Sequence, residues 1–151
     1  MYEISKSLHI LGACLFIGNI IVSAFWKVMA DRTGDYAIIR FATRLVNLTD
    51  GVFTGLGVAL LLGSGHFMAT ALPGGINQPW IIWSYVVFGI SGGLWLLVLV
   101  PVQIKQSRLL AASNGRIPAE YSRLARIWSV VGTLATLIPL PAIFWMVAKA
   151  V

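Results

Sequence analysis

Four long apolar stretches make up most of this chain, and each is about as long as the apolar core of a bilayer is thick. They cover 7–29, 45–72, 80–102 and 127–147 of the 151 residues. A helix needs about 20 residues to cross the hydrocarbon layer. The chain is 58% hydrophobic and only 11% charged, which is too apolar for a soluble domain of this size. The pattern predicts an all-α integral membrane protein with four transmembrane helices.

The segments between these stretches are short, and none is longer than 103–126. Short links make sequential helices antiparallel neighbours, so we expect an up-down four-helix bundle. We interpret the whole chain, 1–151, as a single domain. The chain leaves no room for a soluble catalytic domain, and any chemistry must take place inside the bundle.

Positive residues gather around the first and third connections, whereas the second connection, 73–79, has none. This is the positive-inside bias. It predicts that the first and third connections lie in the cytoplasm and that both termini lie outside. The net charge of +6 brackets the apolar spans rather than forming one polar face, which argues against a nucleic-acid partner.

Only three strongly ionisable side chains, those of His9, Asp50 and His66, sit deep inside the apolar stretches. An ionisable group in hydrocarbon costs about 3 kcal/mol or more, so it is usually kept for ligation, proton movement or helix pairing. Because the first two helices are antiparallel, residues at equal depth have numbers with a near-constant sum. Asn19 is then level with Asp50, and His9 is level with His66.

Two level imidazoles on neighbouring helices predict axial ligands of a membrane haem b. Small residues repeat every four positions along the second helix and give a smooth ridge that a flat ring or another backbone can approach. The predicted metal ligands are His9 and His66. The predicted cofactor-binding set adds four small residues: Gly12, Gly55, Ala59 and Gly63. The alternative is that both histidines stay neutral near the outer interface and bond to headgroups, water or a neighbouring helix.

Two roles are open for Asp50. In the first, it accepts hydrogen bonds from Asn19, Asn47 or Thr54, or pairs with Arg44, and this contact fixes the register between helices. In the second, it belongs to a proton relay. Small and hydroxyl residues on the last two helices are interpreted as helix contacts, namely Gly89, Gly93, Ser129, Gly132, Thr133 and Thr136. Three prolines within the spans predict helix bends, namely Pro101, Pro139 and Pro141.

Four runs, 8–13, 49–54, 120–124 and 143–149, together resemble a bacterial family of four-helix integral membrane proteins classed as a domain of unknown function. The resemblance covers nearly the whole chain. It implies a multi-pass protein of the bacterial inner membrane and supplies no activity.

The first-helix pattern of His9 and Gly12, followed by Phe16 and Gly18, more loosely resembles the four-helix membrane protoporphyrinogen oxidases and the copper-resistance D group. The oxidases bind haem b through a first-helix histidine, which implies that role for His9 and a membrane oxidoreductase. They also depend on a lysine within the third helix. This sequence departs from that pattern, because Lys105 lies beyond the third apolar stretch.

The leading hypothesis is a haem b protein that transfers electrons or handles haem near the outer leaflet, with a redox partner that the sequence does not identify. The alternative is a non-catalytic membrane subunit or small-solute conduit without a cofactor. The small-residue ridges also offer close-packing surface for a homodimer.

Overall fold

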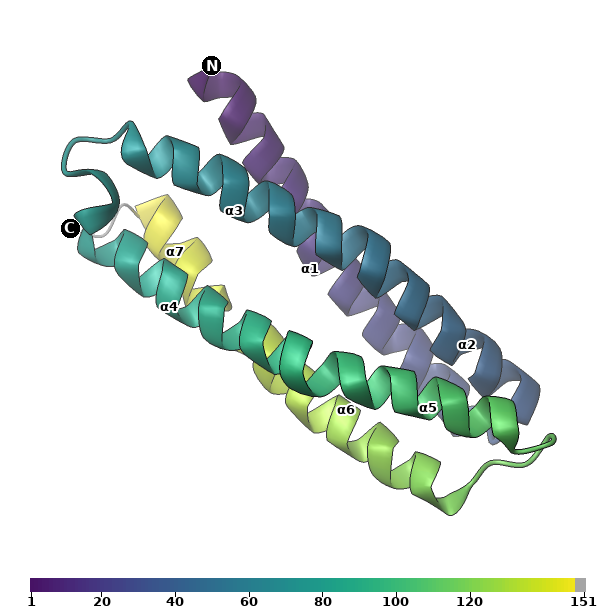
Figure 1. Ribbon diagram of the computed structural model, residues 1–151. Helices are drawn as coiled ribbons and strands as arrows, with labels where there is room; N and C mark the ends of the chain where they lie inside the picture. Colours follow the sequence, from purple (N-terminus) through teal and green to yellow (C-terminus); the bar gives the residue numbers. More distant parts are fainter. Residues whose placement is uncertain (149–151) are drawn as a thin grey trace.

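The protein is an all-helical bundle in the computed structural model, which describes residues 1–148. Four helices are long and apolar enough to cross a membrane, and no strand occurs among the described residues, which confirms the predicted fold class. The spans are Tyr2–Thr33, Tyr36–Thr70, Pro79–Ala112 and Ala119–Ala148 (Figure 1). Lys149, the last residue of the run 143–149, lies outside the described residues.

Three of the four spans are built from more than one helical segment. The first is the single helix α1 (Tyr2–Thr33). The second span consists of α2 (Tyr36–Thr49), η1 (Asp50–Thr54) and α3 (Gly55–Thr70), and the short 3-10 turn η2 (Gly75–Asn77) lies in the connection after it. The third span consists of α4 (Pro79–Leu94), η3 (Trp95–Leu99) and α5 (Val100–Ala112). The fourth consists of α6 (Ala119–Leu137) and α7 (Leu140–Ala148). The segments η1 and η3 are π-helical turns.

The first connection is much shorter than the sequence predicts. Gly34 ends α1 with a φ of 65°, a left-handed conformation that glycine adopts without strain. The Asp35 carboxylate then accepts hydrogen bonds from the backbone N–H groups of Ala37 and Ile38, at 2.8 and 3.0 Å. This N-cap starts α2 nine residues before the apolar stretch at 45 begins. The basic residues around the first connection therefore lie on a helix.

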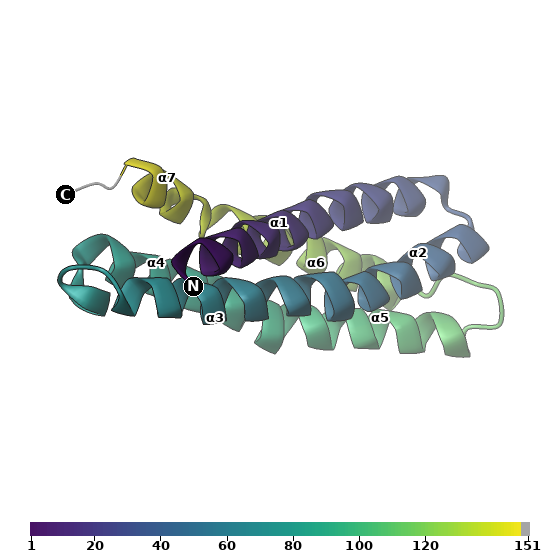
Figure 2. The same cartoon turned by 90° about the horizontal axis from the view of Figure 1, so that it is seen from above.

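Two of the three prolines lie at a change in a helix, whereas Pro141 lies within the first turn of α7. Pro101 is the second residue after the π-helical turn η3. Proline lacks an N–H and its ring crowds the carbonyl four residues earlier, and a wider turn accommodates both effects. In the fourth span α6 ends at Leu137 and α7 begins at Leu140, so the break falls at Pro139. Figures 1 and 2 show α7 turned away from the axis of α6.

The first and third connections lie at the same end of the bundle, as the alternating topology requires (Figure 1). We call this the basic end, because the connections at 34–35 and 113–118 and their flanking turns carry most of the positive charge. At this end Pro118 precedes α6 and Glu120 lies in its first turn. The placement of the basic end in the cytoplasm stays a prediction.

The backbones of α1 and α3 approach each other closely. A Cβ atom added to Gly57 would lie 2.8 Å from the Phe16 backbone nitrogen, and one added to Gly12 would lie 2.9 Å from the Leu60 Cβ. Both distances are shorter than side-chain contacts allow, so these two glycines let the helices touch. Close packing of this kind drives helix association in a bilayer, where burying apolar surface gains little.

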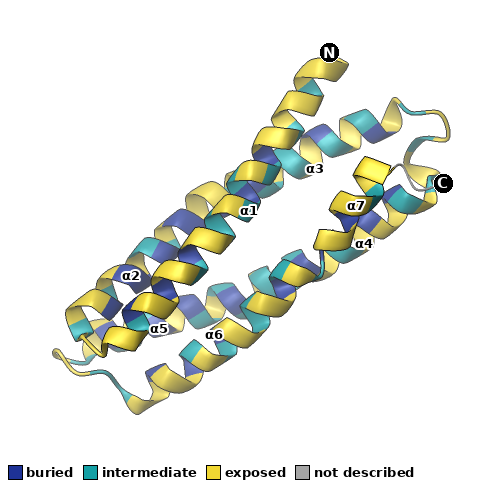
Figure 3. Ribbon diagram, turned by 180° about the vertical axis from the view of Figure 1, so that it is seen from behind, coloured by how far each residue is buried: buried dark blue, intermediate teal, exposed yellow. Residues whose placement is uncertain are grey.

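Large apolar side chains are exposed on the outside of the bundle, as a lipid-facing surface requires. Figure 3 shows how exposed and buried residues are distributed along the helices. Buried residues gather between the helices toward the basic end. One apolar cluster is formed by Val46, Leu99, Trp128 and Ala135, and a second by Ile39, Leu110 and Tyr121. The half of the bundle near the chain termini is more loosely joined.

Replacing Gly57 with alanine tests the contact between α1 and α3. We expect Gly57→Ala to lower the free energy of unfolding in detergent by about 1–3 kcal/mol, because the added methyl group meets backbone atoms of α1. Gly63→Ala on the same helix is the matched control, since nothing lies within 4 Å of its Cβ position. Alanine is also the better helix former, so the control should be neutral or stabilising. Equal destabilisation by both changes would contradict this packing.

Candidate functional site

Asp50 is the centre of a polar layer that joins three spans. Its side chain is only 7% exposed and lies at the start of η1. Asn19 of α1 donates a hydrogen bond to Oδ1 at 2.8 Å, and Gln103 of α5 donates one to Oδ2 at 2.6 Å. Thr54, one turn along, donates a further bond to Oδ1 at 3.3 Å. Both carboxylate oxygens are thus satisfied within the apolar interior.

These contacts confirm the predicted pairing of Asn19 with Asp50 at equal depth. Thr54 is also a partner as predicted, and the Asn19 amide lies 2.9 Å from its hydroxyl. Asn47 instead donates to the Gln103 backbone carbonyl at 3.4 Å. No ion pair joins Arg44 to Asp50 in the described chain. Sequence reasoning missed Gln103 because it lies one residue past the predicted end of the third span.

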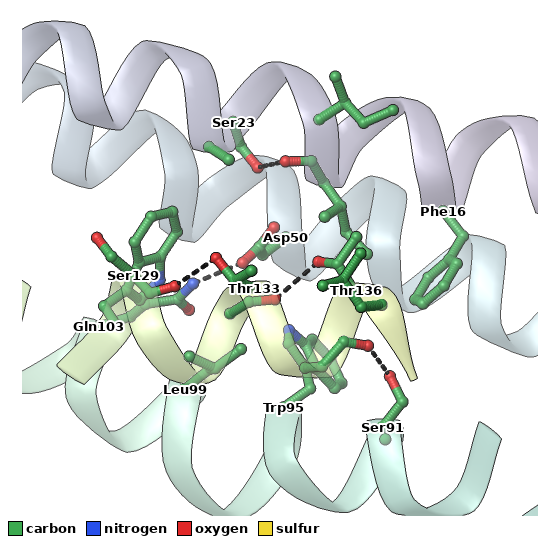
Figure 4. Close-up of a pocket in the computed structure, with 18 of the residues that line it drawn as sticks. Phe16, Ser23, Asp50, Ser91, Trp95, Leu99, Gln103, Ser129, Thr133 and Thr136 are labelled. Carbon is green, nitrogen blue, oxygen red and sulfur yellow. Dashed lines mark hydrogen bonds between the residues drawn. The ribbon is translucent and has the colours of Figure 1, made fainter. Parts of the chain in front are cut away.

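A cavity of about 360 Å³ lies between α1 and α6, with Asp50 and Gln103 on its wall (Figure 4). The Phe16 and Phe88 rings, 5.5 Å apart between centroids, close the end farther from the basic end. Trp128 lines the other end. The two helices meet only sparsely elsewhere, so the space between them is not filled by side chains.

The mouth of the cavity faces lipid rather than water. Ile21 on α1 and Leu137 on α6 line the cavity and are 60% and 54% exposed on the outer surface of the bundle. In a protein whose outer surface contacts acyl chains, a cavity lined by two such residues is open toward the bilayer. A molecule dissolved in the membrane can therefore reach this space without crossing water.

The walls are mostly apolar, and their hydroxyl groups are already bonded. Figure 4 shows Thr133 donating to the Ser129 carbonyl and Thr136 to the Gly132 carbonyl, at 2.8 and 2.7 Å. These residues were predicted to be helix contacts, and the structure corrects that reading, because they line the cavity. The indole N–H groups of two further lining residues, Trp95 and Trp128, are buried. That of Trp128 has no acceptor among the described residues, whereas that of Trp95 lies near the Asp50 carboxylate.

The two histidines lie at the same level but have different neighbours. Nδ1 of His9 is 3.1 Å from the Leu61 carbonyl and 3.3 Å from the Ser64 hydroxyl, so this ring packs against α3. Nδ1 of His66 is 3.1 Å from the Tyr85 hydroxyl on α4, and His66 is exposed. No hydrogen bond or ring contact joins the two imidazoles within residues 1–148. The structure does not assemble them into one compact pair.

The predicted small-residue set divides between two surfaces. Gly12 packs directly against α3, as described above. Ala59 and Gly63 are exposed and Gly55 is partly exposed, so the ridge they form lies on the outside of α3. The inward face of the second span instead carries Asp50, Thr54, Gly57 and Ser64, all buried. These four follow the helical i, i+4, i+7 rule, and so the sequence contained a signal for this face.

A second polar cluster near the basic end was missed by sequence reasoning, which treated Lys27 as a flanking charge. Lys27 is only 1% exposed, and its Nζ lies 3.0 Å from the Asp31 carboxylate and 2.5 Å from the Tyr121 hydroxyl. It also stands 4.8 Å from the Tyr121 ring centroid and 5.8 Å from that of Trp128. Asn19, Ser23, Lys27 and Asp31 recur every four residues, which is the signal that could have revealed this inward polar face.

Comparison with known proteins identifies a family without an assigned activity. The sequence profile of the family described as "Predicted integral membrane protein (DUF2269)" matches residues 3–150. No curated protein and no solved structure matches the chain. Arguments about function therefore rest on the site itself.

A double-mutant cycle tests the hydrogen bond between Asp50 and Gln103. Gln103→Leu leaves a buried carboxylate oxygen without its donor, and we expect a loss of about 1–3 kcal/mol in the free energy of unfolding in detergent. Asp50→Leu should cost a similar amount. The double variant should cost clearly less than the sum, because its second change removes no further bond. Additive losses would show that the two side chains do not interact.

Proposed function

We propose that this chain, which belongs to this family of predicted integral membrane proteins, binds a small, mostly apolar molecule inside the bilayer. The observation that carries the proposal is the cavity of about 360 Å³ between α1 and α6, which has apolar walls, a buried carboxylate and a mouth toward lipid. Ligand pockets in proteins range from about 300 to 1,000 Å³ and combine apolar walls with a few polar groups. This proposal develops the alternative of a membrane subunit or small-solute conduit.

The polar groups favour a neutral ligand with hydrogen-bond acceptors. Asp50 has both oxygens engaged by Asn19, Thr54 and Gln103, so it offers little to a bound cation. The buried indole N–H group of Trp128, on the cavity wall, is a donor that lacks an acceptor among the described residues. A flat, lipid-soluble molecule with carbonyl oxygens, of the quinone class, would provide acceptors and match the apolar walls.

Filling the cavity with a larger side chain tests the proposal. Gly92 and Gly132 both line the cavity and have nothing within 4 Å of their Cβ positions. We expect Gly92→Leu and Gly132→Leu to occupy the space and to weaken binding of a short-chain benzoquinone probe at least tenfold. Saturable quenching of tryptophan fluorescence in detergent measures that binding, because two tryptophans line the cavity.

Gly89→Leu is the matched control. Gly89 lies on the same helix as Gly92, has the same free space around its Cβ position and is exposed on the outer surface, away from the cavity. Its quenching curve should match that of the unchanged protein. Equal, non-saturating quenching in all four proteins would mean that the probe only partitions into detergent, and the proposal would fail.

We propose haem b ligation by His9 as the second candidate function, and one observation favours it. The Nδ1 atom of His9 is engaged by the Leu61 carbonyl and the Ser64 hydroxyl, an arrangement that leaves Nε2 as the metal-binding atom. Haem would supply one-electron transfer. The glycine contact between α1 and α3 leaves no room for a porphyrin between those helices. Because His66 bonds to α4, its ligation of the same iron would require rearrangement or a second chain.

Absorbance spectra of the purified protein test the haem candidate. Oxidised and dithionite-reduced spectra should show a Soret band and sharp reduced bands that are lost in His9→Ala, and His66→Ala shows whether the second ligand is that histidine. A protein that stays colourless after haem is supplied during expression would exclude this candidate. We further propose that the protein lies in the bacterial inner membrane with its basic end in the cytoplasm.

A further inference from the structure

Gln106 on α5 is the most unusual buried group in the bundle. Its side chain is 0% exposed, and neither its amide oxygen nor its amide nitrogen has a partner in the described chain. It lies one helical turn from Gln103, whose amide donates to Asp50. Buried amides without protein partners are satisfied by ordered water, which typically makes about three hydrogen bonds to such groups. Gln106 therefore carries two buried polar groups for which the described chain supplies no partner.

The register between α2 and α5 shows what lies beside Gln106. Asn47 donates to the Gln103 carbonyl, and Tyr36 donates to the Leu110 carbonyl at 2.6 Å. Because the two helices are antiparallel, these contacts place Gln106 level with Thr43. Thr43 is only 1% exposed. The Oδ1 atom of Asn47, which lies on the face of α2 that contacts α5, also has no hydrogen-bond partner in the described chain.

From Thr43 a chain of polar contacts continues to the aqueous surface. The Thr43 hydroxyl lies 3.4 Å from the Tyr121 hydroxyl, which donates to the Asp31 carboxylate at 2.6 Å and accepts from Lys27. The Asp31 side chain is 26% exposed at the basic end. These polar contacts are surrounded by buried apolar residues, among them Ile39, Val46, Leu99 and Leu110. Polar side chains thus lie in sequence from Asp50 to the aqueous surface at Asp31. The connection is interrupted at Gln106, which makes no hydrogen bond in the described chain.

We propose that water held by Gln106 closes this gap and gives protons a path between Asp50, on the cavity wall, and the aqueous surface at Asp31. In each passage one proton enters from bulk water at Asp31, every hydroxyl or water on the path accepts one proton and releases another, and one O–H bond forms at the Asp50 carboxylate. The reverse passage returns that proton to bulk water. The path lets the carboxylate change its charge although it lies in the apolar interior.

Hydrogen–deuterium exchange of the Gln103 side-chain amide tests the path. The amide lies next to Asp50, so its exchange with solvent reports water and proton access to that position. The full chain in lipid nanodiscs is transferred to deuterated buffer, and the amide signal is followed by NMR. We expect Gln106→Leu, which removes both amide groups, to slow exchange at least tenfold, and Thr43→Val, which removes one hydroxyl with little change in shape, to slow it as well.

Two controls keep the test decisive. Ile104→Leu alters the lipid-exposed face of the same helix and should leave the exchange rate unchanged. The Gln78 amide, at the opposite end of the bundle, should exchange equally in every variant. If Gln106→Leu does not fold, Thr43→Val carries the test alone.

Exchange that is equally fast in all variants would mean that water reaches Asp50 through the cavity instead, and the proposed path would be wrong. A missing contact between the Gln106 amide and water in NMR spectra of the unchanged protein would also overturn it. Neither measurement involves a bound ligand. Their outcome is therefore independent of whether the cavity binds the benzoquinone probe.

Discussion

The hydrogen bonds to Asp50 are the interaction on which this bundle depends most. In a bilayer, apolar side chains gain little by leaving lipid for protein, so helices need close packing or polar contacts to hold a fixed arrangement. Asp50 in the second span is bonded to Asn19 in the first and to Gln103 in the third. Without these donors the carboxylate would be buried at high cost. One side chain therefore fixes the relative positions of three of the four spans.

The fourth span is held differently, and this creates the cavity. The helix α6 packs on α5 and α4 through Trp128 and Ala135 and bonds to Ser91, whereas it touches α1 only sparsely. Near the basic end, Lys27 and Tyr121 bridge that gap. Farther along, no comparable bond joins α1 to α6 in the described residues. The polar contacts thus join α1 to α6 at the basic end, and the space farther along stays open as the cavity.

The sequence alone predicted the features that depend on amino-acid composition and on the depth of a residue along its helix. Four apolar runs of sufficient length define four spans, and helix rise alone places Asn19 level with Asp50. It could not predict the helix ends, because basic segments such as 36–44 continue as helix once Asp35 caps them. A regular repeat of small residues also does not reveal which side faces a neighbour, and the ridge of Gly55, Ala59 and Gly63 proved to face outward.

The cavity and the contact between Lys27 and Tyr121 lay beyond sequence reasoning for a related reason. A lysine near a span end looks like a flanking charge, and its burial depends on Tyr121, which is 94 residues away in the chain. Likewise, the space beside Gly132 exists only because α1 and α6 stay apart. Such features arise from contacts between distant segments, which one sequence without its fold does not specify. The haem ligands stay a prediction, as neither the fold nor the family match tests them.

A crystal structure of the protein grown from a lipidic phase is the most direct test of this account. We expect Asp50 within hydrogen-bonding distance of Asn19 and Gln103, and an elongated non-protein electron density in the space between α1 and α6. A structure in which α1 and α6 pack directly against each other, with side chains filling that space and Asp50 turned away from Gln103, would contradict it.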